Sequence, residues 1–119
     1  MTPLREIVKA LKEISEWPWE PDSDLGFILS GNLGIAHVGG VEVEASTELS
    51  DGERKTYISN QHLIASSPRW LAEMVVRLVE SEQYQRSSEG YVKEYALELA
   101  LQKHDITPED FAWLKGKVG

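Results

Sequence analysis

Residues 60–79 carry apolar side chains at helical spacing and define the centre of the predicted fold. At about 100° per residue, the apolar residues between 71 and 79 fall on one side of a helix, and the charged residues fall on the other side. Trp70 and Val76 flank the apolar face and widen it beyond what a surface helix needs. The pattern therefore predicts a core helix that contacts more than one neighbour.

A Ser-Pro pair interrupts this stretch. Ser67 has a side chain favoured at a helix N-cap, and Pro68 is favoured at the first helical position. The residue before a proline also avoids helical geometry. One helix is therefore predicted to end by Ser66 and a second to begin at Pro68. Residues 80–89 are almost wholly polar, so we expect either solvent-exposed last turns or a loop there.

Three further helices are predicted from caps and periodicity. Thr2 and Pro3 open an amphipathic helix that should end near residue 15 or 16. Residues 91–103 carry a broad apolar arc, which favours a well-buried helix that pairs antiparallel with the central one. Thr107 and Pro108, followed by two acidic residues, start a short last helix whose apolar contacts are Phe111 and Leu114.

Between the first and the central helix the period changes to that of strands. Short strands are expected over residues 25–29, 35–38 and 41–45, with a further one possible over 55–58. Residues 46–54 are polar and favour a loop or hairpin tip. The pattern predicts an α+β fold in which a small antiparallel sheet of three to four strands packs against a layer of four to five helices.

Trp17 and Trp19 alternate with prolines, which favours an extended segment with both indoles on the same side. Such a pair can stack on a ligand ring, but covering a small core is the more frequent role of tryptophan. With 119 residues, the chain is expected to be a single domain, with a helix and the sheet in residues 1–58 and a helical part in residues 59–119.

The net charge of −8 is unevenly distributed. Residues 13–53 hold ten acidic residues and no lysine or arginine. Such a segment repels phosphate groups, so direct nucleic-acid binding is disfavoured. The acidity should lie on one side of the sheet and offer a surface to a protein partner. The residues predicted for that surface are Glu42, Glu44, Glu48 and Asp51, together with Trp17 and Trp19.

No motif indicates catalysis, a metal or a cofactor. The absence of cysteine removes disulfides and thiolate ligands, and fits an intracellular protein. His37, His62 and His104 are not at the spacing of a known metal motif, and we predict neither a metal nor a cofactor. A weak metal-dependent hydrolase that uses His37 or His62 stays an alternative. No apolar run is long enough to span a membrane, so we expect a soluble protein of the cytoplasm.

Residues 1–20 (MTPLREIVKALKEISEWPWE), a Gly-rich strand region and residues 60–71 (NQHLIASSPRWL) resemble the Ead-like proteins, small accessory proteins of tailed phages and prophages. The resemblance covers about the first 85 residues. Members typically continue from a Pro-Trp segment to an Asn-Ala-x-Leu-Ile-Ala-Ala-Ala-Pro-x-Leu-Leu helix pair. The matching positions are Asn60, Leu63, Ile64, Ala65, Pro68 and Leu71, and the departures are Gln61, Ser66, Ser67 and Trp70. The resemblance implies a phage or prophage accessory protein, and it brings no catalytic residues with it.

These observations favour a non-catalytic binding protein whose acidic sheet surface meets a host or phage protein, possible targets being a host factor or a defence system. The acidity can equally serve solubility alone. A second hypothesis is a sponge that sequesters a small nucleotide-type signal. Its anion site would use Arg54, Lys55, Tyr57, Arg69, Trp70 and Arg77. The wide apolar arcs also predict a homodimer formed through helices.

Overall fold

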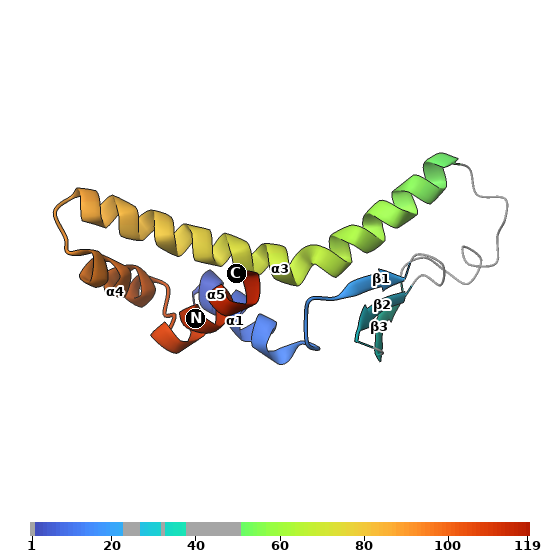
Figure 1. The fold of residues 1–119 in the computed structure, drawn as a ribbon, viewed down its shortest axis with the longest axis horizontal. Helices are drawn as coiled ribbons and strands as arrows, with labels where there is room; N and C mark the ends of the chain where they lie inside the picture. The colour runs from blue at the N-terminus through green and yellow to red at the C-terminus, as the bar shows by residue number, and fades with distance from the viewer. Residues whose placement is uncertain (1, 23–26, 32, 38–50) are drawn as a thin grey trace. The chain divides into compact units, whose positions relative to one another are not determined.

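The computed structural model describes residues 2–22, 27–31, 33–37 and 51–119, without the side chains of His37 and Asp51. In these ranges the elements are α1 (Pro3–Glu13), β1 (Glu20–Asp22), β2 (Phe27–Ser30), β3 (Leu33–His37), α3 (Asp51–Ser88), α4 (Lys93–Lys103) and α5 (Pro108–Val118) (Figure 1). The predicted α+β fold is confirmed.

The chain forms two compact units. The helical unit consists of Met1–Ile14 and Arg69–Gly119, and the sheet unit consists of Ser15–Pro68. The helical unit is therefore built from two separate stretches of sequence, and the sheet unit is inserted between them. This division differs from the boundary between residues 58 and 59 that we expected within one domain.

The caps of α1 and α5 are those that the sequence predicts. Thr2 accepts a hydrogen bond from the backbone N–H of Arg5 at 3.1 Å, and Thr107 accepts one from Asp110 at the same distance. Each threonine is followed by a proline at the first helical position, where no N–H is needed. The two helices begin at the predicted residues for this reason.

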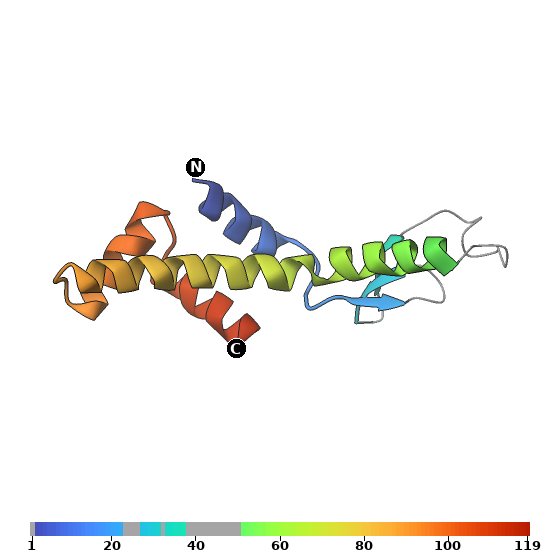
Figure 2. The same ribbon diagram turned by 90° about the horizontal axis from the view of Figure 1, so that it is seen from above.

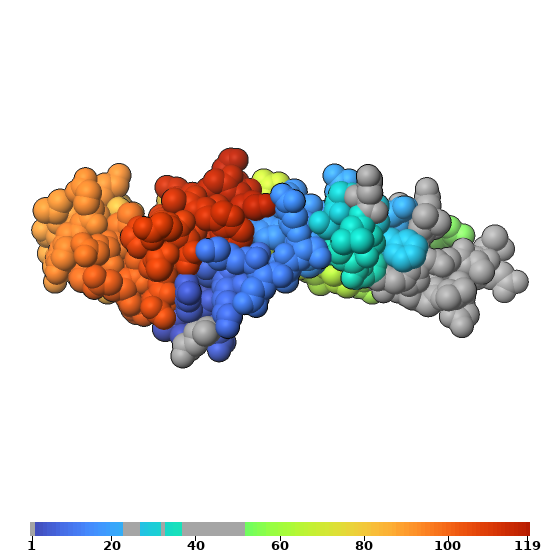
Figure 3. Space-filling model, turned by 90° about the horizontal axis from the view of Figure 1, so that it is seen from below, coloured from blue at the N-terminus to red at the C-terminus, as the bar shows by residue number. Residues whose placement is uncertain are grey.

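The core of the helical unit lies where α1, α4 and α5 meet the second half of α3 (Figure 2). Small and β-branched side chains make up most of this core. The buried apolar residues of this core are Val8, Leu11, Ala72, Val75, Val76, Val79, Ala96, Ala100, Leu101, Ile106, Phe111 and Leu114. Viewed from below, α1, α4 and α5 form a continuous surface over α3 (Figure 3). The predicted contacts of Phe111 and Leu114 are confirmed.

The predicted helix break at Ser67 and Pro68 is wrong, because α3 is one helix with Pro68 inside it. A proline in a helix interior leaves the carbonyl four residues earlier without its usual donor. Here that carbonyl belongs to Ile64, and the hydroxyl of Ser67 donates to it at 2.8 Å. The side chain that we expected to start a new helix instead satisfies the carbonyl that Pro68 leaves free.

The start of α3 corrects two more predictions. Residues 51–54 were expected in a loop and residues 55–58 in a strand, but all of them are helical. A window of four residues is too short to separate strand from helix periodicity, and Glu53, Arg54 and Lys55 have good helix propensity. At the other end, α3 continues through the polar residues 80–88.

The sheet unit holds three antiparallel strands in the order β1-β2-β3. Glu20 pairs with Leu29, and Ile28 pairs with Ala36, with a register shift between Ile28 and Leu29. Ile28 is completely buried in this unit. Strands β2 and β3 correspond to the first two predicted strands, whereas β1 was not predicted. The expected strand over residues 41–45 lies outside the described residues.

Helix α4 begins two residues later than predicted, because Gly90 ends α3 with a φ of 107°. The N–H of Tyr91 donates to the carbonyl of Arg86 at 3.2 Å, a bond typical of a helix that ends at a left-handed glycine. Tyr91, Val92 and Tyr95 are exposed by 44%, 67% and 49%, so this end of the helix is less buried than expected. Across the described ranges, none of the helices combines the length and apolar character needed to cross a bilayer.

Candidate functional site

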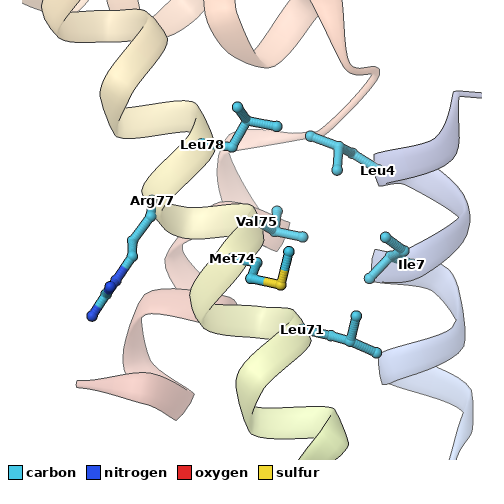
Figure 4. Close-up of a pocket in the computed structure, with 7 residues that line it drawn as sticks. All are labelled: Leu4, Ile7, Leu71, Met74, Val75, Arg77 and Leu78. Atoms are coloured by element: carbon cyan, nitrogen blue, oxygen red, sulfur yellow. The ribbon is translucent and has the colours of Figure 1, made fainter.

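An apolar groove separates α1 from α3 in the helical unit (Figure 4). Leu4 and Ile7 of α1 project toward Leu71, Met74 and Leu78 of α3, and the groove has a volume of about 430 Å³. Val75 forms its floor, since that side chain is buried. The three α3 residues are exposed by 38%, 66% and 42%, so their apolar surface is open to solvent.

The positions of these residues on α3 explain the groove. Leu71, Met74 and Leu78 are spaced three and four residues apart, so they form one stripe along the helix. Ala72, Val75, Val76 and Val79 occupy the neighbouring face and fill the core. The sequence pattern placed Leu71, Met74 and Leu78 on the core face of this helix, but the buried face is centred on Ala72, Val75, Val76 and Val79. The three stripe residues are the part of the predicted apolar face that stays partly exposed.

Trp70 and Arg77 lie on the flank of the stripe that faces away from α1. Trp70 is 42% exposed. Arg77 lines the edge of the groove, and its guanidinium group points away from it (Figure 4). They are seven residues apart, which places them two turns from each other on the same side of α3. Arg69, which lies one turn before Glu73, forms an ion pair with it at 3.4 Å and is directed elsewhere.

A second hollow of about 480 Å³ lies at the corner between α3 and α4. It is lined by Glu80, Gln83, Tyr84, Ser87 and Lys93. The side-chain amide of Gln83 donates to the carbonyl of Lys93 at 3.0 Å, and the buried hydroxyl of Ser87 has no partner. Sequence reasoning missed this hollow because it depends on the turn at Gly90, which no periodic signal reveals.

A buried carboxylate joins α1 to α5. Asp110 is 5% exposed, and it accepts hydrogen bonds from Lys12 and, at 2.7 Å, from Arg5. The bond from Lys12 is the main reason why the pKa of Asp110 is lowered, and Arg5 adds to it against the opposing effect of burial. The ammonium of Lys12 also lies 5.7 Å from the ring centre of Trp113. The cluster holds helices together and leaves no free group for chemistry.

His104 and Glu82 form a second polar contact inside the helical unit. The imidazole Nε2 lies 3.0 Å from both carboxylate oxygens, and Lys103 lies 3.3 Å from one of them. Burial raises the pKa of Glu82, but the hydrogen bonds and charges of His104 and Lys103 outweigh it, so the pKa is lowered. The backbone carbonyl of His104 also accepts from the hydroxyl of Thr2 at 2.6 Å.

The residues predicted for the acidic surface are only partly placed. Glu42, Glu44 and Glu48 lie outside the described residues, and Asp51 is the first residue of α3. Trp17 is 2% exposed and belongs to the core of the sheet unit, as its more frequent role suggested. The indole N–H of Trp19 donates to the carbonyl of Ser15 at 3.1 Å. Neither indole is a freely presented stacking platform.

The residues of the alternative anion site fall into both units. Arg54 and Lys55 are exposed and Tyr57 is half-buried in the sheet unit, whereas Arg69, Trp70 and Arg77 belong to the helical unit. Among the histidines, His62 is exposed and His104 is engaged with Glu82. In the part of the chain that the structure describes, no three histidine or carboxylate side chains come together as metal ligands.

The division into units also divides the charge. The sheet unit holds nine acidic and two basic residues, so its net charge is −7. The helical unit holds eleven acidic and ten basic residues, so its net charge is −1. Almost all of the excess negative charge therefore belongs to one compact unit of the protein.

Comparisons of the chain with protein-family models, with curated proteins and with solved structures find no match. The resemblance to the Ead-like accessory proteins therefore stays a prediction from the sequence.

Proposed function

We propose that this protein is a non-catalytic accessory protein of a phage or prophage that binds a basic protein through its acidic sheet unit in the cytoplasm of the bacterial host. The observation that supports this proposal is the charge of −7 on the sheet unit beside −1 on the helical unit. A difference of this size between two units of similar length favours a specific electrostatic role over general solubility.

Helix α3 is continuous through Pro68, so the proposal uses no helix break and depends on the separation of charge between the two units. Among the described residues, Glu16, Glu20 and Glu53 are exposed on the sheet unit. Charges of one sign on a surface accelerate association with an oppositely charged partner and make binding sensitive to salt.

The test is capture of bacterial host proteins by the immobilised chain over a series of salt concentrations. We expect a basic protein to bind at about 50 mM salt and to dissociate near 500 mM, where the Debye length falls to a few ångströms. Glu20→Gln with Glu53→Gln should weaken capture several-fold. Glu80→Gln with Glu89→Gln removes the same charge from the helical unit and should leave capture unchanged.

Two results would overturn the proposal. One is equal loss of capture in both pairs of variants, which would show that only total charge matters. The other is a nucleotide-sized mass retained in native mass spectrometry of the purified chain, which would favour the nucleotide sponge instead.

A further inference from the structure

We infer that the apolar groove between α1 and α3 is covered by the same groove of a second copy, with the two α3 helices antiparallel and crossing at Met74. This inference concerns the helical unit and goes beyond the proposed function, which rests on the sheet unit. It begins from the stripe of Leu71, Met74 and Leu78, which shares the groove with Leu4 and Ile7 of α1. Contiguous exposed apolar side chains on a soluble protein are a frequent site of protein association.

The stripe is complementary to itself in an antiparallel arrangement. Leu71 precedes Met74 by three residues and Leu78 follows it by four. Along the helix axis, Leu71 therefore lies about 4.5 Å before Met74 and Leu78 about 6 Å after it. A two-fold axis at Met74 therefore places Leu71 of one copy within about 1.5 Å in height of Leu78 of the other. Each apolar side chain then meets an apolar side chain.

The flank of the stripe matches in the same way. In an antiparallel pair, the two-fold axis is perpendicular to the plane that contains both helices. The same flank of each helix therefore lies on the same side of the pair. Trp70 lies about 6 Å before Met74 and Arg77 about 4.5 Å after it, so Arg77 of one copy reaches the height of Trp70 of the other. A guanidinium over an indole face is a favourable contact, and the symmetry produces it twice.

Charge also selects the helical unit as the contact between copies. Two sheet units carry −7 each and repel one another, whereas two helical units carry only −1 each. Glu6 and Glu13 lie on the solvent side of α1, away from Leu4 and Ile7, so the groove itself holds no carboxylate. A second copy therefore meets apolar surface and a cation–aromatic pair in the groove, with no carboxylate among the lining residues.

The first test is the mass of the full chain in solution, measured by light scattering after size exclusion. We expect twice the chain mass of 13.4 kDa. Met74→Glu places a charge in the centre of the contact and should give a monomer. Tyr84→Glu changes a side chain that is 78% exposed on the same helix but off the stripe, and this variant should stay dimeric. Circular dichroism of both variants checks that the helices are retained.

The second test fixes the orientation. The chain has no cysteine, so Met74→Cys supplies a single thiol. Oxidised glutathione should link two copies of Met74→Cys through a disulfide, because residues at the two-fold axis are close enough for one. Tyr84→Cys should stay unlinked under the same conditions.

A wild-type mass of 13.4 kDa at all concentrations would overturn the inference. So would a dimer that survives in Met74→Glu, since the contact would then lie elsewhere. If Met74→Glu is monomeric but Met74→Cys does not crosslink, the antiparallel arrangement about Met74 is wrong. If Met74→Glu loses its helices, the crosslinking result decides alone.

Discussion

Replacing Asp110 by alanine should destabilise the helical unit strongly, because this one carboxylate joins α1 to α5. Asp110 is 5% exposed and accepts hydrogen bonds from Arg5 and Lys12. Hydrogen bonds to charged groups contribute about 1.5–3 kcal/mol each, and breaking a fully buried ion pair costs about 3–5 kcal/mol. The side chains of Arg5 and Lys12 are 32% and 47% exposed, so both regain water when the carboxylate is removed.

The expected loss in the free energy of unfolding is therefore at the lower end, about 2–3 kcal/mol. For a chain of this size, that loss lowers the melting temperature by about 10 °C and the urea midpoint by about 1.5 M. The assay is urea unfolding followed by circular dichroism. Glu109→Ala is the matched control, because it removes an exposed acid from the same first turn of α5. It should cost less than about 1 kcal/mol.

The pH dependence gives a second readout of the same contact. Lys12 and Arg5 lower the pKa of Asp110 in the folded protein. A lowered pKa means that the stabilisation is fully present above the unfolded-state pKa and is lost as the pH falls through the folded-state pKa. The difference in stability between the wild type and Asp110→Ala should therefore shrink below about pH 4. Equal urea midpoints for Asp110→Ala and Glu109→Ala at pH 7 would refute this reasoning.

Two other substitutions test the backbone of α3 and its end. Ser67→Ala should lower the free energy of unfolding in urea by about 1 kcal/mol, because the carbonyl of Ile64 loses its donor. In the Pro68→Ala background a backbone N–H returns to that carbonyl, so the same change should be nearly neutral, and equal costs in both backgrounds would contradict this account. Gly90→Ala should lower the melting temperature by several degrees, because the φ of 107° at this position is unfavourable for any residue with a side chain. The control is Gly116→Ala in α5, where an added methyl meets no atom, and it should raise the melting temperature slightly. An unchanged melting temperature in Gly90→Ala would show that a left-handed glycine is not required there.

The helix starts and the fold class could be predicted because their signals are local. Thr2 with Pro3 and Thr107 with Pro108 each place a capping oxygen and a proline where a helix needs them, and the structure confirms both. The same rule failed at Ser67 and Pro68. Ser67 and Pro68 are the residue types of a helix start. The helix nevertheless continues through Pro68, because the hydroxyl of Ser67 donates to the carbonyl of Ile64, which the proline leaves without a backbone donor.

The contacts that position the helices could not be predicted, because they join distant residues. Asp110 has the sequence signature of a first-turn acid in α5, and nothing local reveals that it reaches Arg5 and Lys12. The sequence predicted a wider apolar face on this part of α3 than a surface helix needs. Which part of that face stays open depends on where α1 and α5 pack, and this follows only from the assembled fold.

Because the sheet unit is inserted in the sequence of the helical unit, the two parts of the helical unit are synthesised at different times. Arg5 and Asp110 are 105 positions apart, so α1 leaves the ribosome long before its partner helix exists. At about 5–20 residues per second, that delay is roughly 5–20 s. During this time Val8 and Leu11 have no core to enter, while all residues of the sheet unit emerge before the helical unit is complete. Until translation is finished, the nascent chain therefore exposes the apolar face of α1, which is a binding site for chaperones.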